Sequence, residues 1–429
     1  MCPLGLLRRG APLSGEVYGL KRFLPVILAV LAALPWLVCR LLGLHFIPPV
    51  TAALSGMAIL GAAFLLSWAA EVAQLEISAA LAVAILALIA VLPEYSVDMY
   101  FAWMAGKDPS YTQYAAANMT GANRLLIGLG WSSVLLLYWW KTKRPVLHFE
   151  RKDAVELGAL VIATVYCFLL PIKGTLSLLD TVVLIAVFVM YIRATSKQGV
   201  EEPELIGPAE ALSTLARRSR RTATVAMFLY AALAILVSAE PFAEGLVHTG
   251  TMLGIDEFFL VQWLAPLASE APEFIVAALF ALQGRGQLGV RAMISSKVNQ
   301  WTLLIGMLPL CYAISSGSIH AMVLDHRQVQ EVLLTVAQSA FAIAVLAKMD
   351  YTVGAAVALM VLFLSQLFTP HLHLFFSIVY LVLTVGLLIV QRQRLVGVAM
   401  AVGNILRPVP VAVEEKEGGA LQPDQARLP

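Results

Sequence analysis

Twelve apolar segments run through the chain, and their length is the feature that most restricts its fold. They fall at about 22–44, 48–70, 77–105, 111–140, 154–171, 175–193, 222–245, 255–283, 287–312, 328–348, 351–369 and 371–391. A helix needs about 20 apolar residues to cross a bilayer. Of the 429 residues, 60% are hydrophobic and only 13% are charged, about half the charged fraction of a soluble domain. The sequence therefore predicts an all-α polytopic membrane protein with about twelve transmembrane helices.

Basic residues are distributed unevenly between the segments that connect these spans. If the N-terminus is inside, 23 of the 29 lysines and arginines lie in cytoplasmic segments, and only Lys107, Lys173 and Arg327 lie outside. Positive charge favours the cytoplasmic side of a membrane. The pattern predicts a multi-pass protein with cytoplasmic N- and C-termini, and the short loops favour a prokaryotic plasma membrane.

Several functional classes are disfavoured by composition and motifs. A net charge of +2 gives no indication of a nucleic-acid partner. The four cysteines lie far apart and predict neither a disulfide framework nor a zinc site. No cleaved signal peptide is expected, because no short apolar core with a cleavage site follows the first basic residues. Without an ATP-binding motif or a nucleophile constellation, we expect no enzyme and no cofactor; the bilayer is the expected partner, and a homo-oligomer is compatible with the sequence.

A proline followed directly by a glutamate interrupts two of the apolar segments. These dipeptides are Pro93-Glu94 and Pro272-Glu273. Each proline lacks the backbone donor that would bind the carbonyl four residues earlier in the helix. A carboxylate beside such an interruption within a membrane is a candidate functional site. We therefore expect two broken helices, each with a glutamate near the middle of the membrane.

The two Pro-Glu dipeptides belong to an internal repeat. They are 179 residues apart, and the motif Leu-Leu-Ile-Gly at 125–128 recurs at 303–306, which is 178 residues later. Five spans separate the two proline-containing helices, and an odd number inverts the second copy in the membrane. The sequence predicts two inverted five-helix repeats with broken helices at the midplane and one flanking helix at each end, as in secondary transporters.

This repeat divides the chain into six predicted parts. They are an N-terminal tail with an extra transmembrane helix at 1–47, the first repeat at 48–193, a cytoplasmic linker at 194–221, the second repeat at 222–369, an extra C-terminal transmembrane helix at 370–407 and a disordered tail at 408–429.

Side chains with oxygen atoms accompany both glutamates, and oxygen ligands are those that Ca²⁺ prefers. The predicted ligand set is Glu94, Glu273, Glu270, Asp98, Asn123, Asn299, Asn118 and Ser296. The alternative for Glu94 and Glu273 is a structural role in capping the broken helices. For Asp98 it is a polar contact in the vestibule, for Glu270 a salt bridge to Lys297, and for Asn123 and Asn299 hydrogen bonding between helices. Glu71, Glu240 and Glu244 lie toward span ends and are expected in a vestibule or interface. The seven histidines lie in loops or at span edges and receive no role.

These motifs resemble the Ca²⁺/cation antiporter superfamily, which includes the sodium/calcium exchangers. That family carries G-T-S-L-P-E in one helix and G-N-x-x-G-S-N-x-x-N-I-G in the next. The chain has Leu-Pro-Glu at 92–94, and it matches the second motif at Asn118, Gly121, Asn123, Ile127 and Gly128. The resemblance covers roughly 48–369. It implies secondary active antiport of Ca²⁺, or a related inorganic cation, in exchange for Na⁺, with H⁺ as the alternative coupling ion.

The chain also departs from the family pattern. The ligand just before Ile-Gly is replaced by Leu126 and Leu304, and two bases, Arg124 and Lys297, enter the site helices. A cation in the middle of a membrane costs at least about 2.5 kcal/mol without partners, so each base should neutralise nearby acids. One hypothesis pairs Lys297 with Glu270 or Glu273, where its ammonium would replace a bound monovalent ion; the alternative is a structural counter-ion role for both bases.

Two rival functions remain at this point. A membrane hydrolase could use paired carboxylates such as Glu94 and Asp98, although such an enzyme needs no inverted repeat. A non-transporting scaffold or sensor could keep the fold after losing the site, which the leucines at 126 and 304 make conceivable.

Overall fold

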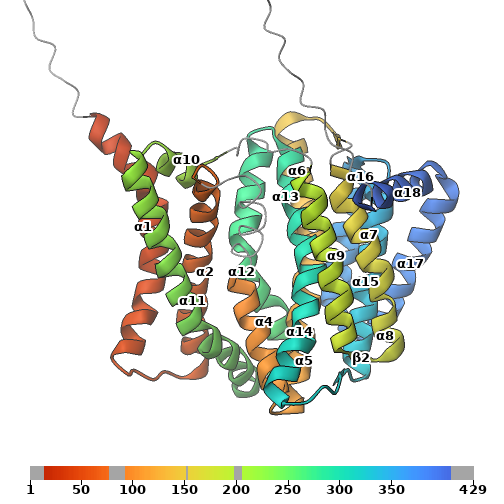
Figure 1. Cartoon of the computed structure of the whole chain (residues 1–429), viewed down its shortest axis with the longest axis horizontal. Helices are drawn as coiled ribbons and strands as arrows, with labels where there is room; N and C mark the ends of the chain where they lie inside the picture. The colour runs from red at the N-terminus through yellow and green to blue at the C-terminus, as the bar shows by residue number, and fades with distance from the viewer. Residues whose placement is uncertain (1–13, 77–91, 151–152, 198–204, 407–429) are drawn as a thin grey trace, which may run out of the picture.

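The computed structural model describes residues 14–76, 92–150, 153–197 and 205–406, and it is a bundle of long helices (Figure 1). The α-helices are α1 (Ser14–Leu41), α2 (Pro48–Ala73), α4 (Leu92–Ala105), α5 (Thr112–Leu125), α6 (Ser132–Thr142), α7 (Ala154–Cys167), α8 (Leu169–Lys173), α9 (Leu178–Ser196), α10 (Pro208–Ser213), α11 (Arg217–Leu253), α12 (Glu257–Leu282), α13 (Gly286–Asn299), α14 (Ile305–Ser316), α15 (His326–Leu346), α16 (Val353–Phe368), α17 (His373–Val390) and α18 (Gln393–Leu406). Short 3-10 turns occupy η1 (Pro109–Tyr111) and η5 (Pro370–Leu372), and π-helical segments occupy η2 (Leu126–Trp131) and η4 (Gln300–Leu304).

Nine helices in the described part of the chain are long and apolar enough to cross a membrane. They are Arg22–Leu41, Pro48–Ala73, Ala154–Lys173, Leu178–Ser196, Arg217–Leu253, Glu257–Leu282, Gly286–Ser316, His326–Leu346 and Pro370–Val390. The predicted span 111–140 forms a continuous helical path through α5, η2 and α6, whereas the span 351–369 becomes the shorter α16. Only the second half of the predicted span 77–105 lies within the described residues, as α4. The polytopic all-α prediction is confirmed.

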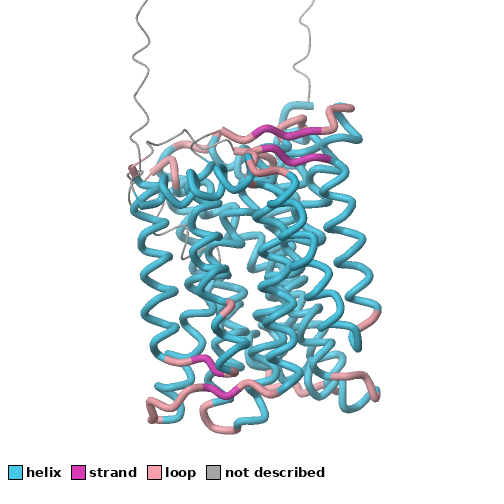
Figure 2. Tube along the Cα trace, turned by 90° about the vertical axis from the view of Figure 1, so that its right-hand side faces the viewer, coloured by secondary structure: helices cyan, strands magenta, loops and turns pink. Residues whose placement is uncertain are grey.

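Two short antiparallel strand pairs show directly that the repeats are inverted. Strand β1 (Val146–His148) pairs with β4 (Asp350–Thr352), and β2 (Thr175–Leu176) pairs with β3 (Met322–Val323). By the repeat offset, β1 is equivalent to β3 and β2 to β4. Each strand of the first copy thus pairs with the non-equivalent strand of the second, at opposite ends of the bundle (Figure 2). Copies of the same orientation would place equivalent strands at the same end, so only inversion gives this pattern.

The helices form two packed groups. The main hydrophobic core joins helices of both repeats, while a second core joins α1, α2, α10 and α11 at one edge of the bundle (Figure 1). Small residues allow these edge helices to approach closely, as is common at helix interfaces within membranes: a Cβ added at Gly61 would lie 2.4 Å from the carbonyl oxygen of Ala29. The molecule therefore has an edge unit beside a larger unit that holds most of the two repeats.

The C-terminal region contains one helix more than the predicted single span at 370–407. It divides at residues 391–392 into α17 and α18, and α18 packs against α7. Gly158 allows this contact, because a Cβ there would lie 2.2 Å from the carbonyl oxygen of Ala401. The buried residues of α18 include Arg394 and Gly397, whereas Leu395, Val396 and Met400 are exposed, so the helix does not bury its most apolar face.

Candidate ion-binding site

Glu94 and Asp98 lie on one face of α4, one turn apart and buried. Glu94 occupies the first turn of the helix, where the unpaired backbone N–H groups carry a partial positive charge that favours an anion. The four residues before Leu92, including the carbonyl of Ile89 that Pro93 was expected to free, lie outside the described residues.

The second copy supplies Glu270 and Glu273 from α12. This helix continues from Glu257 to Leu282 with Pro266 and Pro272 inside it. The expected interruption at Pro272 is therefore a missing hydrogen bond within a continuous helix rather than a gap between two half-helices. Proline's fixed φ is compatible with helical geometry, and a neighbouring helix can support the distorted turn.

Gln300 connects the acids of the two copies. Its Nε2 donates to Glu94 Oε2 at 2.9 Å and to Glu270 Oε1 at 3.0 Å. Gln300 was not in the predicted ligand set. Its signal was weak, because the corresponding position of the family motif does not identify a glutamine. The structure makes it the residue that holds two carboxylates together across the repeat interface.

A small cavity of about 10 Å³ lies at this junction, which is room for about one water-sized particle. Its walls are Glu94, Leu126, Ser269, Glu270, Glu273, Ser296 and Gln300. Buried oxygens on four of these side chains have no hydrogen-bond partner within the described residues: Glu94 Oε1, Glu270 Oε2, Glu273 Oε2 and Gln300 Oε1. Unpaired buried oxygens are costly, and a cation or protons would satisfy them.

The described side chains do not form a closed cage for a metal. No group of three or more His, Cys, Asp or Glu residues in the described ranges has the geometry to hold an ion. A cation in this cavity would therefore draw on the amide and hydroxyl oxygens of Gln300, Ser269 and Ser296 as well as on carboxylates. Mixed oxygen ligands of this kind are typical of Ca²⁺.

Asp98 and Asn118 lie next to each other, one turn away from the cavity. Both are buried, and neither the carboxylate nor the side-chain amide has a hydrogen bond with good geometry in the described structure. They do not line the cavity. These two predicted ligands form a polar extension of the site rather than part of its wall.

Lys297 contacts Asn123 rather than an acid. Its Nζ donates to Asn123 Oδ1 at 2.7 Å and lies 3.9 Å from the centre of the Trp301 ring. Within the described residues it makes no ion pair, so the expected pairing with Glu270 or Glu273 is wrong for this structure. The physical reason is that Asn123 on the facing helix α5 offers a neutral acceptor, and Trp301 in η4 offers an aromatic face, and together they accommodate the ammonium.

Both polar atoms of the Asn123 side chain have protein partners. Its Nδ2 donates to the carbonyl of Met119 at 2.8 Å, and its Oδ1 accepts from Lys297. Asn299 accepts from the hydroxyl of Tyr95 at 3.2 Å. These two predicted ligands lie in contacts between helices, and neither lines the cavity.

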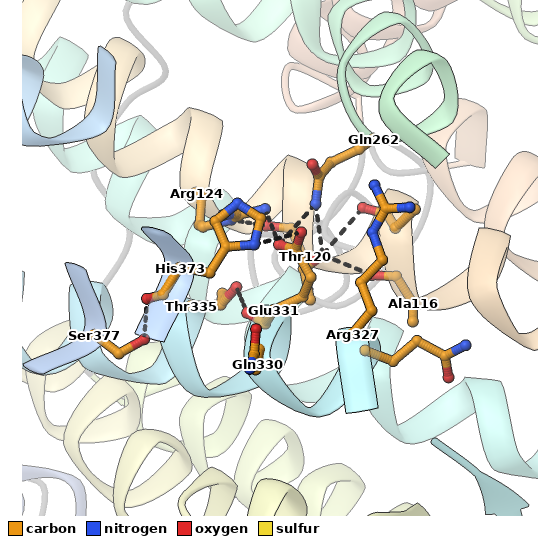
Figure 3. Close-up of polar contacts among 12 residues, drawn as sticks. Ala116, Thr120, Arg124, Gln262, Arg327, Gln330, Glu331, Thr335, His373 and Ser377 are labelled. Carbon is orange, nitrogen blue, oxygen red and sulfur yellow. Dashed lines mark hydrogen bonds and ion pairs between the residues drawn. The ribbon is translucent and has the colours of Figure 1, made fainter. Parts of the chain in front are cut away.

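Arg124 takes part in a separate buried network that the sequence did not reveal (Figure 3). It forms an ion pair with Glu331 on α15, and Gln262 on α12 donates to the same carboxylate at 2.9 Å. His373 Nδ1 lies 3.2 Å from the other oxygen of Glu331. The signal available was a lone glutamate within the predicted span 328–348. His373 lies at a span edge, as expected, but it has a buried polar contact although no histidine was assigned a role.

The acids near the span ends have separate partners. Glu244 accepts from the hydroxyl groups of Tyr100 at 2.6 Å and Tyr111 at 2.8 Å. These contacts join α11 to α4 and η1. The interface role expected for Glu244 agrees with them, whereas Glu240 is exposed on α11.

π-Helical segments occur at corresponding places in the two copies. Segment η2 follows α5, and η4 follows α13. The equivalent residues Leu126 and Leu304 both lie inside them. A π-helical turn widens the helix and often marks a functional site. Here these segments contain the two leucines at positions where the resemblance implied a ligand, and Leu126 lines the cavity.

Two inverted copies that bring buried carboxylates to one interface inside a membrane define a secondary transporter. A family model described as sodium/calcium exchanger protein matches residues 47–196 and 223–392. The chain therefore belongs to the sodium/calcium exchanger family, whose members are transporters and not enzymes.

Solved structures agree with this assignment. The crystal structure of the H⁺/Ca²⁺ exchanger CAX is 42% identical, with a TM-score of 0.86, and the match covers 90% of this chain and 99% of that one. The structure of native YfkE is 15% identical, with a TM-score of 0.58 and coverage of 84% and 99%, which is a likeness of fold alone. No protein with a curated description matched the chain by sequence.

Proposed function

We propose that the protein is a secondary active antiporter that exchanges Ca²⁺ for H⁺. The observation that carries the proposal is that the Gln300 amide bridges Glu94 and Glu270, which both line the cavity. The second carboxylate oxygen of each glutamate has no hydrogen-bond partner among the described residues. Carboxylates held this close repel one another unless a cation or protons neutralise them. Competition between Ca²⁺ and protons for the same oxygens is the simplest basis for exchange.

Three carboxylates bind the transported ion in this proposal. Glu94 and Glu270 supply one carboxylate from each copy, and Glu273 supplies a third from the cavity wall. Two of them can neutralise one Ca²⁺, and Gln300 and Ser296 add neutral oxygen ligands. Protons then replace the ion on the same carboxylates in the return step.

The choice of H⁺ over Na⁺ as the coupling ion has two supports. Lys297 places an ammonium group against Asn123 Oδ1, so this amide oxygen is not free to bind sodium. The related H⁺/Ca²⁺ exchanger CAX, at 42% identity, is the second support. Na⁺ coupling, which the sequence motifs first favoured, remains the alternative because the family includes sodium/calcium exchangers.

Alternating access would come from movement of the edge unit against the site. Helices α2 and α11 have a hydrophobic core of their own with α1 and α10, and α11 contacts the site helix α4. Sliding of these helices would expose the cavity to one side and then the other. In this proposal both termini are cytoplasmic, and the protein lies in the cell membrane.

The test is uptake of radioactive Ca²⁺ into vesicles that contain the purified protein. We expect an outward H⁺ gradient to drive uptake and an outward Na⁺ gradient to have no effect. Glu273→Gln should abolish the uptake, while Glu240→Gln, a matched change at an exposed position of α11, should not alter it. Uptake driven only by Na⁺ would reject H⁺ coupling, and no uptake with either gradient in folded protein would reject Ca²⁺ antiport.

A further inference from the structure

A groove of about 610 Å³ opens between α15, α16 and α17, away from the ion-binding cavity. Apolar side chains line most of its length, among them Phe341 and Val345 of α15 and Val382 and Leu387 of α17. Gly386 leaves space in the groove, because a Cβ added there would meet no atom within 4 Å. The lining extends from Val382 to Val390, which is about 12 Å along a helix.

The groove is polar at one end only. Asp350, Thr352, Gln391 and Arg394 lie there, beside the β1–β4 pair at one end of the bundle (Figure 2). An apolar channel that ends in charged groups at the surface of a membrane protein has the polarity of a phospholipid molecule.

Hydrogen bonds hold the guanidinium of Arg394 through its Nε and Nη1 atoms and, among the described residues, leave Nη2 without a partner. Its Nε donates to Gln391 Oε1 at 2.8 Å, and its Nη1 donates to the carbonyls of Ala344 at 2.8 Å and Val345. Arg394 is 9% exposed, and within the described part of the chain its Nη2 donates no hydrogen bond. A guanidinium held in this way presents its remaining donors to a phosphate.

Asp350 supplies the opposite charge. Its Oδ1 is buried and has no hydrogen-bond partner among the described residues, and within those residues Asp350 forms no ion pair with Arg394. The carboxylate would repel a headgroup that carries only negative charge. A headgroup with a phosphate and a primary ammonium would satisfy both residues.

The surroundings indicate that the groove faces lipid. On α17, Val382 is 63% exposed and Val390 is 80% exposed, and the neighbouring α18 exposes Leu395 and Met400. Apolar side chains this open in a membrane protein contact acyl chains. In residues 407–429 the apolar run 408–413 is followed by three glutamates, at positions 414, 415 and 417.

We propose that this groove binds phosphatidylethanolamine, with one acyl chain along α17, the phosphate at Arg394 and the ammonium at Asp350. The ammonium donates hydrogen bonds to the carboxylate, which the quaternary ammonium of phosphatidylcholine cannot do, and phosphatidylglycerol has no cation at all. The site requires no transport activity, so it is independent of the function proposed above.

Native mass spectrometry of the full-length protein in detergent tests the proposal, with phosphatidylethanolamine, phosphatidylcholine and phosphatidylglycerol titrated separately. We expect phosphatidylethanolamine to bind about tenfold more tightly than the other two, the difference that one charged hydrogen bond provides. Gly386→Phe should fill the groove and abolish this binding. Gly403→Phe, at an equally open glycine on α18 outside the groove, should leave it unchanged.

Asp350→Asn tests the headgroup separately from the groove. This variant keeps the side-chain shape and should still bind phospholipid, but it should lose the preference for phosphatidylethanolamine over phosphatidylglycerol. Equal binding of all three lipids by the natural protein would overturn the proposal. A dimer that Gly386→Phe dissociates would place a second copy in the groove, and lipid binding that appears only when the chain ends at Leu406 would place the tail there; either result also overturns it.

Discussion

Single residues decide how charge is distributed inside this membrane protein. Two of the three acids at the cavity, Glu94 and Glu270, share the amide of Gln300. The two bases lie with other partners: Lys297 with Asn123, and Arg124 with Glu331. Each base is thus accommodated without occupying the cavity. This separation leaves the carboxylates available to a mobile cation, which is what an exchanger needs.

Lys297→Met should change the ion coupling of transport. The substitution removes the ammonium but keeps an unbranched side chain of similar length, and it frees Asn123 Oδ1. We expect Na⁺ to stimulate Ca²⁺ uptake in this variant and the ratio of charges exchanged to shift, as measured by uptake together with membrane potential in vesicles. Unchanged coupling and stoichiometry would show that Lys297 is only structural.

Glu331→Gln should destabilise the protein strongly. Removing one partner of a buried ion pair leaves Arg124 without compensation, which costs about 3–5 kcal/mol. Thermal denaturation in detergent should show a lower midpoint for this variant. The double variant Arg124→Met with Glu331→Gln should recover much of the loss, because it removes both charges together. An equal loss in the single and double variants would argue against the pair as the cause.

At the scale of helices, a charge cluster joins the end of α2 to the beginning of α11. Glu76, just after α2, contacts Arg217, Arg220 and Arg221 at the beginning of α11. Hydrogen bonds from Arg220 and then Arg221 lower the pKa of Glu76 to about 2. The cluster joins the ends of the two helices that we propose to move during transport.

The stabilisation from Glu76 should depend on pH in one direction. Because the folded pKa is below the ordinary value of 4.5, the contribution is complete above pH 4.5 and is lost as the pH falls toward about 2. Glu76→Gln should therefore lower the thermal midpoint at neutral pH, and the difference from the natural protein should shrink in acid and at high salt. A constant difference at all pH values would exclude the charge as its source.

On the scale of the whole molecule, inversion of the repeats fixes which segments share a side of the membrane. The β1–β4 pair puts the connection between α6 and α7 beside the connection between α15 and α16. The β2–β3 pair puts the connection between α8 and α9 beside the connection between α14 and α15. The β1 and β4 end also carries the basic cluster of the predicted cytoplasmic face, Lys141, Lys143, Arg144 and Lys348.

Single cysteines can test this orientation. With the native cysteines replaced by alanine, His148→Cys in β1 and Val323→Cys in β3 place exposed thiols at opposite ends of the bundle. In intact cells an impermeant maleimide should label the Val323→Cys protein, and it should label the His148→Cys protein only after the cells are opened. The reverse pattern would invert the proposed topology, and labelling of both from outside would contradict the fold.

Much of the architecture could be predicted from the sequence, because the bilayer imposes it locally. Each span must satisfy its own backbone in lipid, so apolar length alone predicts helices. The spacing of Pro93-Glu94 and Pro272-Glu273, with an odd number of spans between them, predicted the inversion. Glu94, Glu270, Glu273 and Ser296 were predicted as ligands on the same grounds, and all four line the cavity.

Contacts between distant helices could only come from the tertiary structure. Gln300 was one amide among several until its distances to Glu94 and Glu270 were known. Glu331 and Arg124 are 207 residues apart, and no local pattern relates them. The sequence determined which segments cross the membrane and which acids belong to a repeat, since those properties follow from local polarity and spacing. The packing of helices decided which acid meets which base, because in a low-dielectric interior each charge is stabilised only by the groups that touch it.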